Sequence, residues 1–341
     1  DVTVARTQAG ATSSPTRSLF AGGTTPTVQN VIDFVTQSTT GNATDFGDLV
    51  GTIRQLNQGI ISSSTRGVFA GGFNPSMSSV VQNVTMASQG DAIDYGDLLQ
   101  PIRLQASASD SVRGVCFYGY SNPGYEQQIE QFNIASGGQS VNTGGDTTVT
   151  SGGGSGVSDS HGGLNDGYQG TRFLNVVAGA GRGLFAGAFA PANIGSIEFV
   201  QISTLGNGND FGDLTIARGR GGVTTSNIRS HLAGGTAPSA NGSNNIDYTT
   251  LTSTGNYADF GNLTTSHLQC TALNNSTRGV RAGGYNGDPG SFTNVMDYWT
   301  LATAGNAADF GNLSSTKGSL SSGASTTRGI VAGGRSPGGK N

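Results

Sequence analysis

The sequence predicts an all-β fold, a β-propeller of about seven blades, and three observations support this prediction. An apolar phrase of the type Thr-Arg-Gly-Val-Phe-Ala-Gly-Gly, found at 65–72, recurs seven times along the 341 residues. A second phrase such as Val-Ile-Asp-Phe, at 31–34, follows six of these copies. A third phrase such as Gly-Asn-Ala-Thr-Asp-Phe-Gly-Asp-Leu, at 41–49, then closes most units. A fixed period of about 49 residues indicates a solenoid, a propeller or an array.

Each phrase predicts one part of a blade. The first phrase is apolar or small on both alternating faces, which predicts an inner strand near the axis that is covered on both sides. The second phrase predicts a half-polar strand, with Ile32 and Phe34 on one face and Asp33 on the other. The third phrase places turn residues around one aromatic anchor, Phe46. Segments that follow it, such as 53–56, predict a further strand, and three or four short strands per unit are typical of a propeller blade.

The two ends of the chain read as parts of one unit. Residues 1–6, Asp-Val-Thr-Val-Ala-Arg, align with residues 213–218, Asp-Leu-Thr-Ile-Ala-Arg, and the chain also ends within a unit. Because a ring removes its edges when both termini share a blade, we expect seven blades, the last one reduced and closed by N- and C-terminal strands. Its missing strand predicts an edge open to a strand of a partner. The alternative is six blades, with the residues from about 311 onward as an appendage.

We expect one domain, residues 1–341, with a Gly/Ser-rich insertion at about 145–172. Successive arginines of the first phrase are separated by 47 to 50 residues, except that 69 residues separate Arg113 from Arg182. The chain begins with Asp rather than Met, which is compatible with a removed signal or pro-segment.

Composition excludes several classes of function. The formal net charge is -4 and the lysines are Lys317 and Lys340 alone, so we expect no nucleic-acid partner. No run of 18 apolar residues occurs, so we expect no membrane span. Cys116 and Cys270 lie in different units without the spacing of a disulfide framework or a metal site, and we expect no metal and no cofactor.

Two sets of charged residues recur at fixed repeat positions. We expect them to pair as a structural ladder where blades meet, because Arg is rarely buried without a partner and a carboxylate suits it. The alternative is a ring of arginines that binds an anion in the central channel. The set consists of Arg17, Arg66, Arg113, Arg182, Arg229, Arg278 and Arg328 with Asp45, Asp94, Asp210, Asp259 and Asp309.

No catalytic constellation is apparent, and we expect no enzyme. The glutamates are Glu126, Glu130 and Glu198, and the last two occupy the repeat position of Asp33, which predicts polar strand residues rather than a hydrolytic pair. The histidines show no ligand spacing; His231 replaces an apolar residue of the first phrase.

Candidate binding residues lie in the loops and in the insertion. Aromatic side chains next to Asn and Pro in the loops after the first phrase are able to stack on a sugar face. The insertion predicts either a flexible surface loop or a docking loop. The candidates are Phe73, Tyr120, Tyr125, Phe189 and Tyr285 in the loops, and Asp159, His161 and Tyr168 in the insertion.

The repeat resembles the kelch repeat, in which an apolar strand ending in Gly-Gly precedes a strand ending in Tyr. The match holds at Gly283-Gly284 with Tyr298 and at Gly234-Gly235 with Tyr248, whereas the kelch Trp is missing. The phrases at 64–72 and 41–49 are also similar to repeats in virion and hypothetical proteins of marine cyanobacterial phages. That resemblance covers nearly all of the chain outside about 145–172.

The resemblance implies a non-enzymatic phage virion component of the tail, fibre, baseplate or capsid surface. Such a component would be located on the virion or outside the cell, and its partners would be other virion proteins or copies of itself. The alternative is a lectin-like, carbohydrate-binding propeller that recognises host surface glycans.

Overall fold

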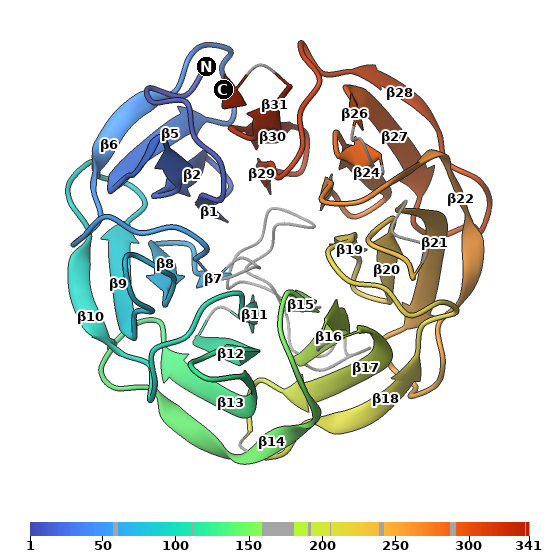
Figure 1. Ribbon diagram of the computed structural model, residues 1–341, viewed down its shortest axis with the longest axis horizontal. Helices are drawn as coiled ribbons and strands as arrows, with labels where there is room; N and C mark the ends of the chain where they lie inside the picture. Colours follow the sequence, from blue (N-terminus) through green and yellow to red (C-terminus); the bar gives the residue numbers. More distant parts are fainter. Residues whose placement is uncertain are drawn as a thin grey trace.

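The computed structural model describes residues 1–56, 61–110, 112–158, 181–189, 192–204, 206–238, 242–286, 291–337 and 339–340. Across these residues the regular structure is entirely β, and six four-stranded antiparallel sheets lie around a ring (Figure 1). The two-stranded sheet β29–β30, Ser321–Ala324 and Gly329–Ala332, lies between the sixth sheet and the first. The prediction of a β-propeller is therefore confirmed. The ring has six complete blades, and the two-stranded sheet β29–β30 lies where a seventh blade would be.

Each complete blade runs from an innermost strand at the axis to an outermost strand at the rim. Blade 1 has β1 (Gly10–Ser13), β2 (Arg17–Ala21), β5 (Val31–Thr36) and β6 (Thr44–Asp48); blade 2 has β7 (Ile61–Ser62), β8 (Arg66–Ala70), β9 (Val80–Thr85) and β10 (Ile93–Asp97). Blade 3 has β11 (Ala106–Ser109), β12 (Arg113–Tyr120), β13 (Tyr125–Asn133) and β14 (Val141–Ser151); blade 4 has β15 (Ser155–Ser158), β16 (Arg182–Phe189), β17 (Asn193–Gln201) and β18 (Asn209–Asp213). Blade 5 has β19 (Gly222–Thr225), β20 (Arg229–Ala233), β21 (Ser243–Thr250) and β22 (Ala258–His267); blade 6 has β23 (Thr271–Asn274), β24 (Arg278–Ala282), β27 (Val295–Thr300) and β28 (Ala308–Asn312).

Short hairpins follow the second strand in three places around the ring. They are β3–β4 (Thr24–Thr25 with Thr27–Val28), β25–β26 (Tyr285–Asn286 with Ser291–Phe292) and β31–β32 (Arg335–Ser336 with Gly339–Lys340). No helix that is long and apolar enough to cross a membrane occurs in the residues covered by the structure.

The prediction that the first phrase forms the innermost strand is wrong. The first phrase forms the second strand of each blade, and the innermost strand is the short run before it, such as Gly10–Ser13 or Ala106–Ser109. Innermost strands of neighbouring blades pack on one another, so small residues fit there. The strand expected at 53–56 is also absent: Gln55 turns with φ 55° and Arg54 makes a single bridge to Phe73.

The third phrase holds neighbouring blades together. Gly47 has φ 144° at a bulge of the outermost strand, and a Cβ there would lie 2.5 Å from the carbonyl of Gly90 in the next blade. In turn, the Gly90 N–H donates to the Phe46 carbonyl at 2.8 Å. Gly90, which starts the third phrase of blade 2, thus packs on the Asp-Phe-Gly of blade 1, and Phe46 packs into an apolar cluster that joins blades 1 and 2.

The start of the insertion also differs from the expected boundary. Residues 145–151 complete β14 and residues 155–158 form β15, the innermost strand of blade 4. Burial alternates from Thr143 to Thr147, with Thr143, Gly145 and Thr147 buried, as expected of a strand. The remainder of the expected insertion lies outside the described residues.

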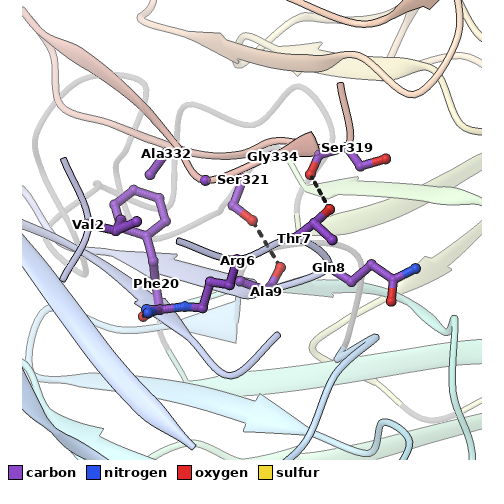
Figure 2. A pocket seen from close by; sticks show the side chains of 11 residues that line it. Val2, Arg6, Thr7, Gln8, Ala9, Phe20, Ser319, Ser321, Ala332 and Gly334 are labelled. Carbon is purple, nitrogen blue, oxygen red and sulfur yellow. Dashed lines mark hydrogen bonds between the residues drawn. The ribbon is translucent and has the colours of Figure 1, made fainter. Parts of the chain in front are cut away.

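The N-terminal segment closes the ring. The Asp1 carbonyl accepts from Ala43 N at 2.8 Å, just as the Asp213 carbonyl accepts from Tyr257 N at 2.8 Å, so the expected equivalence of 1–6 and 213–218 holds. The Arg6 carbonyl accepts from Gly334 N at 3.0 Å. Figure 2 shows this contact region, where Thr7 and Ala9 are hydrogen-bonded to Ser319 and Ser321. Residues 1–6 form no strand ladder, so closure there uses single hydrogen bonds.

Candidate functional site

The repeated arginines and aspartates do not pair with one another as expected. Arg17 stacks over Phe34 of its own blade, at 4.8 Å, and its Nη1 donates to the Met86 carbonyl of the next blade at 2.9 Å. The same donation to the next blade recurs at Arg66, Arg113, Arg182 and Arg229. In the parts of the chain that the structure describes, no ion pair joins these arginines to the expected aspartates.

The repeated aspartates order the bulge of the outermost strand. Asp45 accepts from Gly47 N at 3.3 Å, and a carboxylate two residues before the glycine does so again at Asp94, Asp210, Asp259 and Asp309. A short local bond of this kind needs no arginine. The anion-channel alternative also fails for these arginines, because none of the seven lines the central cavity.

A different set of acids links the blades, and we call each such contact an acid clip. The third strand of a blade carries a carboxylate or amide that accepts a hydrogen bond from a residue in or just after the outermost segment of the preceding blade. The donor is a backbone N–H, except at Thr264, whose hydroxyl donates to Asp297. Leu99 N donates to Glu130 at 2.8 Å, and Thr148 N donates to Glu198 at 2.9 Å. The other acid clips are Val50 to Gln82, Thr215 to Asp247, Thr264 to Asp297 and Thr3 to Asp33.

Three acid clips include buried ion pairs that the sequence prediction missed. Arg6 lies 2.7 Å from Asp33, Arg218 lies 2.9 Å from Asp247, and Arg281 contacts Asp297. Burial lowers the pKa of Arg6, and the Asp33 carboxylate opposes this shift. The available signal was the alignment of 1–6 with 213–218, which places Arg6 and Arg218 at one repeat position.

Burial also shifts the pKa values of the two buried glutamates and of two histidines. Glu130 and Glu198 are buried, which raises the pKa of each carboxyl, while Ser140 and Thr148 donate to them. Burial lowers the pKa of His231 to about 3 and that of His267 to about 4. No group of three or more His, Cys, Asp and Glu suited to a metal ion occurs in the described residues.

Four of the five loop candidates come together in one arginine–aromatic row. Phe73 follows the end of β8, whereas Tyr120 and Phe189 are the last residues of β12 and β16. These strand ends lie on one face of the ring because the blades repeat the same direction. Tyr125 contacts Tyr120, with ring centroids 5.3 Å apart, and Phe189, with centroids 6.5 Å apart.

Two arginines that the sequence prediction missed complete the row. Arg103 lies over both Phe73, at 4.8 Å, and Tyr120, at 4.9 Å, while Arg54 lies over Phe73 at 5.3 Å. Arg54 and Arg103 occupy the same place after the third phrase, which was the available signal. The row, Arg54–Phe73–Arg103–Tyr120–Tyr125–Phe189, spans blades 2 to 4 and is partly exposed throughout.

The remaining candidates lie elsewhere. Tyr285 packs against Phe292 in the hairpin of blade 6, with centroids 5.2 Å apart, and Arg335 lies 5.9 Å over Phe292. Asp159, His161 and Tyr168 lie outside the described residues. The row therefore offers aromatic faces and guanidinium donors side by side, which suits planar or hydroxyl-rich ligands.

The central cavity has a volume of about 470 Å³ and is lined by the innermost strands and the turns before them. Equivalent residues in these turns have a left-handed backbone, as at Gln55 with φ 55° and Arg220 with φ 57°. Gln55 N donates to the Gln8 carbonyl at 3.1 Å, and Ser319 N donates to the Gln269 carbonyl at 2.9 Å, so the turns link one unit to the next. These hydrogen bonds between units give the repeated left-handed turn a structural role.

Fold and site together define a β-propeller, a fold that suits a protein–protein interaction scaffold. Neither models of protein families nor the sequences of curated proteins match this chain.

Proposed function

We propose that this chain is a non-enzymatic scaffold of a phage virion, in the tail, fibre, baseplate or capsid surface, and that it binds other virion proteins or copies of itself. The observation that carries this proposal is that the buried acids have a structural role. In the acid clips, each of them accepts hydrogen bonds that hold one blade to the next. The similarity of the repeats to those of phage virion proteins supports the virion location, outside the cell.

Reconstruction of the native particle by electron cryomicroscopy tests the scaffold proposal. We expect a propeller at a symmetric position, in contact with neighbouring subunits. A chain that is absent from purified particles and monomeric in the surrounding medium would refute the virion role.

A second candidate function, glycan binding, is favoured by the arginine–aromatic row. Tyr125 contacts Tyr120 and Phe189, so its ring holds the row together. If host surface polysaccharide binds there, Tyr125→Ala should weaken glycan-array binding at least tenfold, whereas Tyr285→Ala, outside the row, should not change it.

Equal loss for both variants, or binding by neither protein, would count against the row as a glycan site. Release of new reducing ends from a bound polysaccharide would contradict the non-enzymatic part of the proposal.

A further inference from the structure

Among the described residues, six of the seven junctions around the ring carry an acid clip, and none is found at the junction between blade 6 and β29–β30. At that junction the equivalent of Val50, Leu99 and Thr215 is Ser314, which follows Asn312-Leu313 at the end of β28. No acid among the described residues binds Ser314, and its side chain is exposed. The strand that would carry the acid is the third strand, and β30 has no such neighbour in the described structure.

Backbone groups at the two ends of β30 also lack the hydrogen bonds that a third strand would supply. In blades 1, 2, 5 and 6, the first glycine after the second strand donates to the third strand, for example Gly22 N to the Val31 carbonyl at 3.0 Å. The equivalent donor is Gly333 N, and it finds no acceptor within the described residues. Similarly, Gln37 N donates to the Thr16 carbonyl, whereas the Thr327 carbonyl accepts from no described backbone donor.

Two repeated arginines lack the partners that a third strand provides. Arg278 stacks over Tyr298 at 4.6 Å but is exposed, and no described carbonyl accepts from its guanidinium. Arg328 stacks on no described ring, and its Nη1 is buried without a hydrogen-bond partner. In the complete blades, Arg17 obtains both contacts, from Phe34 of its own third strand and from the Met86 carbonyl of the next one.

Apolar surface is open at the same place. Phe310 of β28 is 48% exposed, whereas its equivalent Phe260 is 3% exposed. Gly261 lies against the next blade, with a Cβ position 2.3 Å from the Gly305 carbonyl oxygen, whereas a Cβ at Gly311 would meet nothing within 4 Å. Ile330 and Val331 of β30 are only partly buried, although their equivalents Leu19 and Phe20 are fully buried.

These unmet contacts converge on one gap, and from them we infer that the β30 edge takes up an extended strand from a second polypeptide. The inference rests on the proposed scaffold function and specifies the chemistry of its partner. The strand would carry the pattern of the chain's own third strands: an aliphatic residue, an acid, an aromatic residue. Its acid would bind Ser314 N, its aromatic ring would lie under Arg328, and its backbone would pair with Gly333 N and the Thr327 carbonyl. Arg278 and Arg328 give the gap the positive charge that an acidic strand complements.

A peptide with the sequence of residues 30–37, Asn-Val-Ile-Asp-Phe-Val-Thr-Gln, labelled and with blocked ends, is the direct probe. We expect saturable one-to-one binding to the 341-residue protein by fluorescence anisotropy, together with slower hydrogen exchange at Gly333. Replacing its Asp by Lys and its Phe by Ala should weaken binding at least tenfold. In the protein, Arg328→Ala should weaken binding at least tenfold as well, whereas Arg220→Ala, a matched loss of charge at the central cavity, should not.

Absence of binding up to about 1 mM peptide, or equal binding of the two peptides, would overturn the inference. Binding that survives Arg328→Ala would place the peptide elsewhere and overturn it too. Either result leaves the scaffold proposal standing, because association with the native particle is measured separately from strand uptake by the isolated chain.

Discussion

Arg66 and Arg278 occupy one repeat position but have different surroundings. Arg66 donates to Tyr95 Oη at 2.7 Å and to the Ile134 carbonyl at 3.3 Å, whereas Arg278 has only its stacking contact with Tyr298 among the described residues. Arg66→Ala should therefore lower the free energy of unfolding by about 2–3 kcal/mol, and Arg278→Ala by about 0.5–1 kcal/mol.

Denaturant unfolding of both variants at one pH measures the difference. Equal losses would mean that the contact with the next blade contributes nothing, and that the arginine acts through its own blade alone.

His231 makes stability depend on pH. Burial lowers its folded-state pKa to about 3, and its ring packs against Phe260 with centroids 4.8 Å apart. The unfolded chain binds this proton near pH 6.5, so stability is full above that pH and is lost as pH falls toward 3. His231→Leu, which copies Leu184 of blade 4, removes this loss.

The wild-type free energy of unfolding should fall relative to that of His231→Leu by up to about 1.4 kcal/mol per pH unit below pH 6.5. Denaturant unfolding near pH 7 and near pH 5 checks this, and a difference that does not change with pH would contradict a buried, neutral His231. His267 titrates in both proteins, so its contribution cancels.

At the scale of residues, the sequence predicted which positions carry recurring side chains better than it predicted the groups that those side chains contact. The repeated arginines were found, but their partners are backbone carbonyls of the next blade, such as that of Met86, which have no side-chain signature. Phe73 and Tyr125 were expected in loops, but Tyr125 begins β13, and Arg103 was missed because it joins the row only across a blade boundary.

At the scale of elements, the outermost strand shows how a blade depends on its neighbour. Gly261 and Gly311 have equivalent places and positive φ, 147° and 124°, but only Gly261 lies against a following blade. Gly261→Ala should cost about 1–3 kcal/mol more than Gly311→Ala, because its Cβ meets the Gly305 backbone as well as adding backbone strain.

Thermal or denaturant unfolding of the two variants gives this difference directly. Equal costs would show that backbone strain alone sets the requirement for glycine in the Asp-Phe-Gly phrase.

Strand order was the part of the blade that sequence predicted wrongly. Innermost strands such as β1 and β11 are runs of four small or hydroxyl residues, too short and too small in side chain to be distinguished from a loop. The second, third and outermost strands carry larger side chains with a visible period, and for them the three phrases sufficed.

At the scale of the whole molecule, Arg6 and Arg218 form equivalent buried ion pairs in different settings. The Arg218 pair lies at an internal junction, whereas the Arg6 pair lies where the two ends of the chain meet. Either change to Ala leaves a buried carboxylate without its cation, so each should cost about 3–5 kcal/mol.

Hydrogen exchange should separate the two variants. In Arg6→Ala, protection should be lost first in β1, β2, β29 and β30, since residues 1–6 accept the hydrogen bond from Gly334 and no peptide bond joins them to β30. Uniform loss of protection around the ring in Arg6→Ala would contradict a distinct closure at the termini.

The ring was predictable from the repeat, whereas the expected closure by an N-terminal strand was wrong, because residues 1–6 form no strand. Residues 1–6 copy 213–218, and the hydrogen bonds of Asp1 follow those of Asp213. The start of the insertion was misplaced because its Gly and Ser content hid β15, whose place follows from the ring rather than from its composition.

The position of the chain ends has a mechanical consequence. The two ends of the chain meet at one junction (Figure 1), where Gly334 N donates to the Arg6 carbonyl and Ser321 donates to the Ala9 carbonyl. A pull applied between the two ends is therefore carried by non-covalent contacts alone, whereas the junctions between complete blades are also crossed by the continuous chain. We therefore expect tension to open the ring at this junction before any complete blade unfolds.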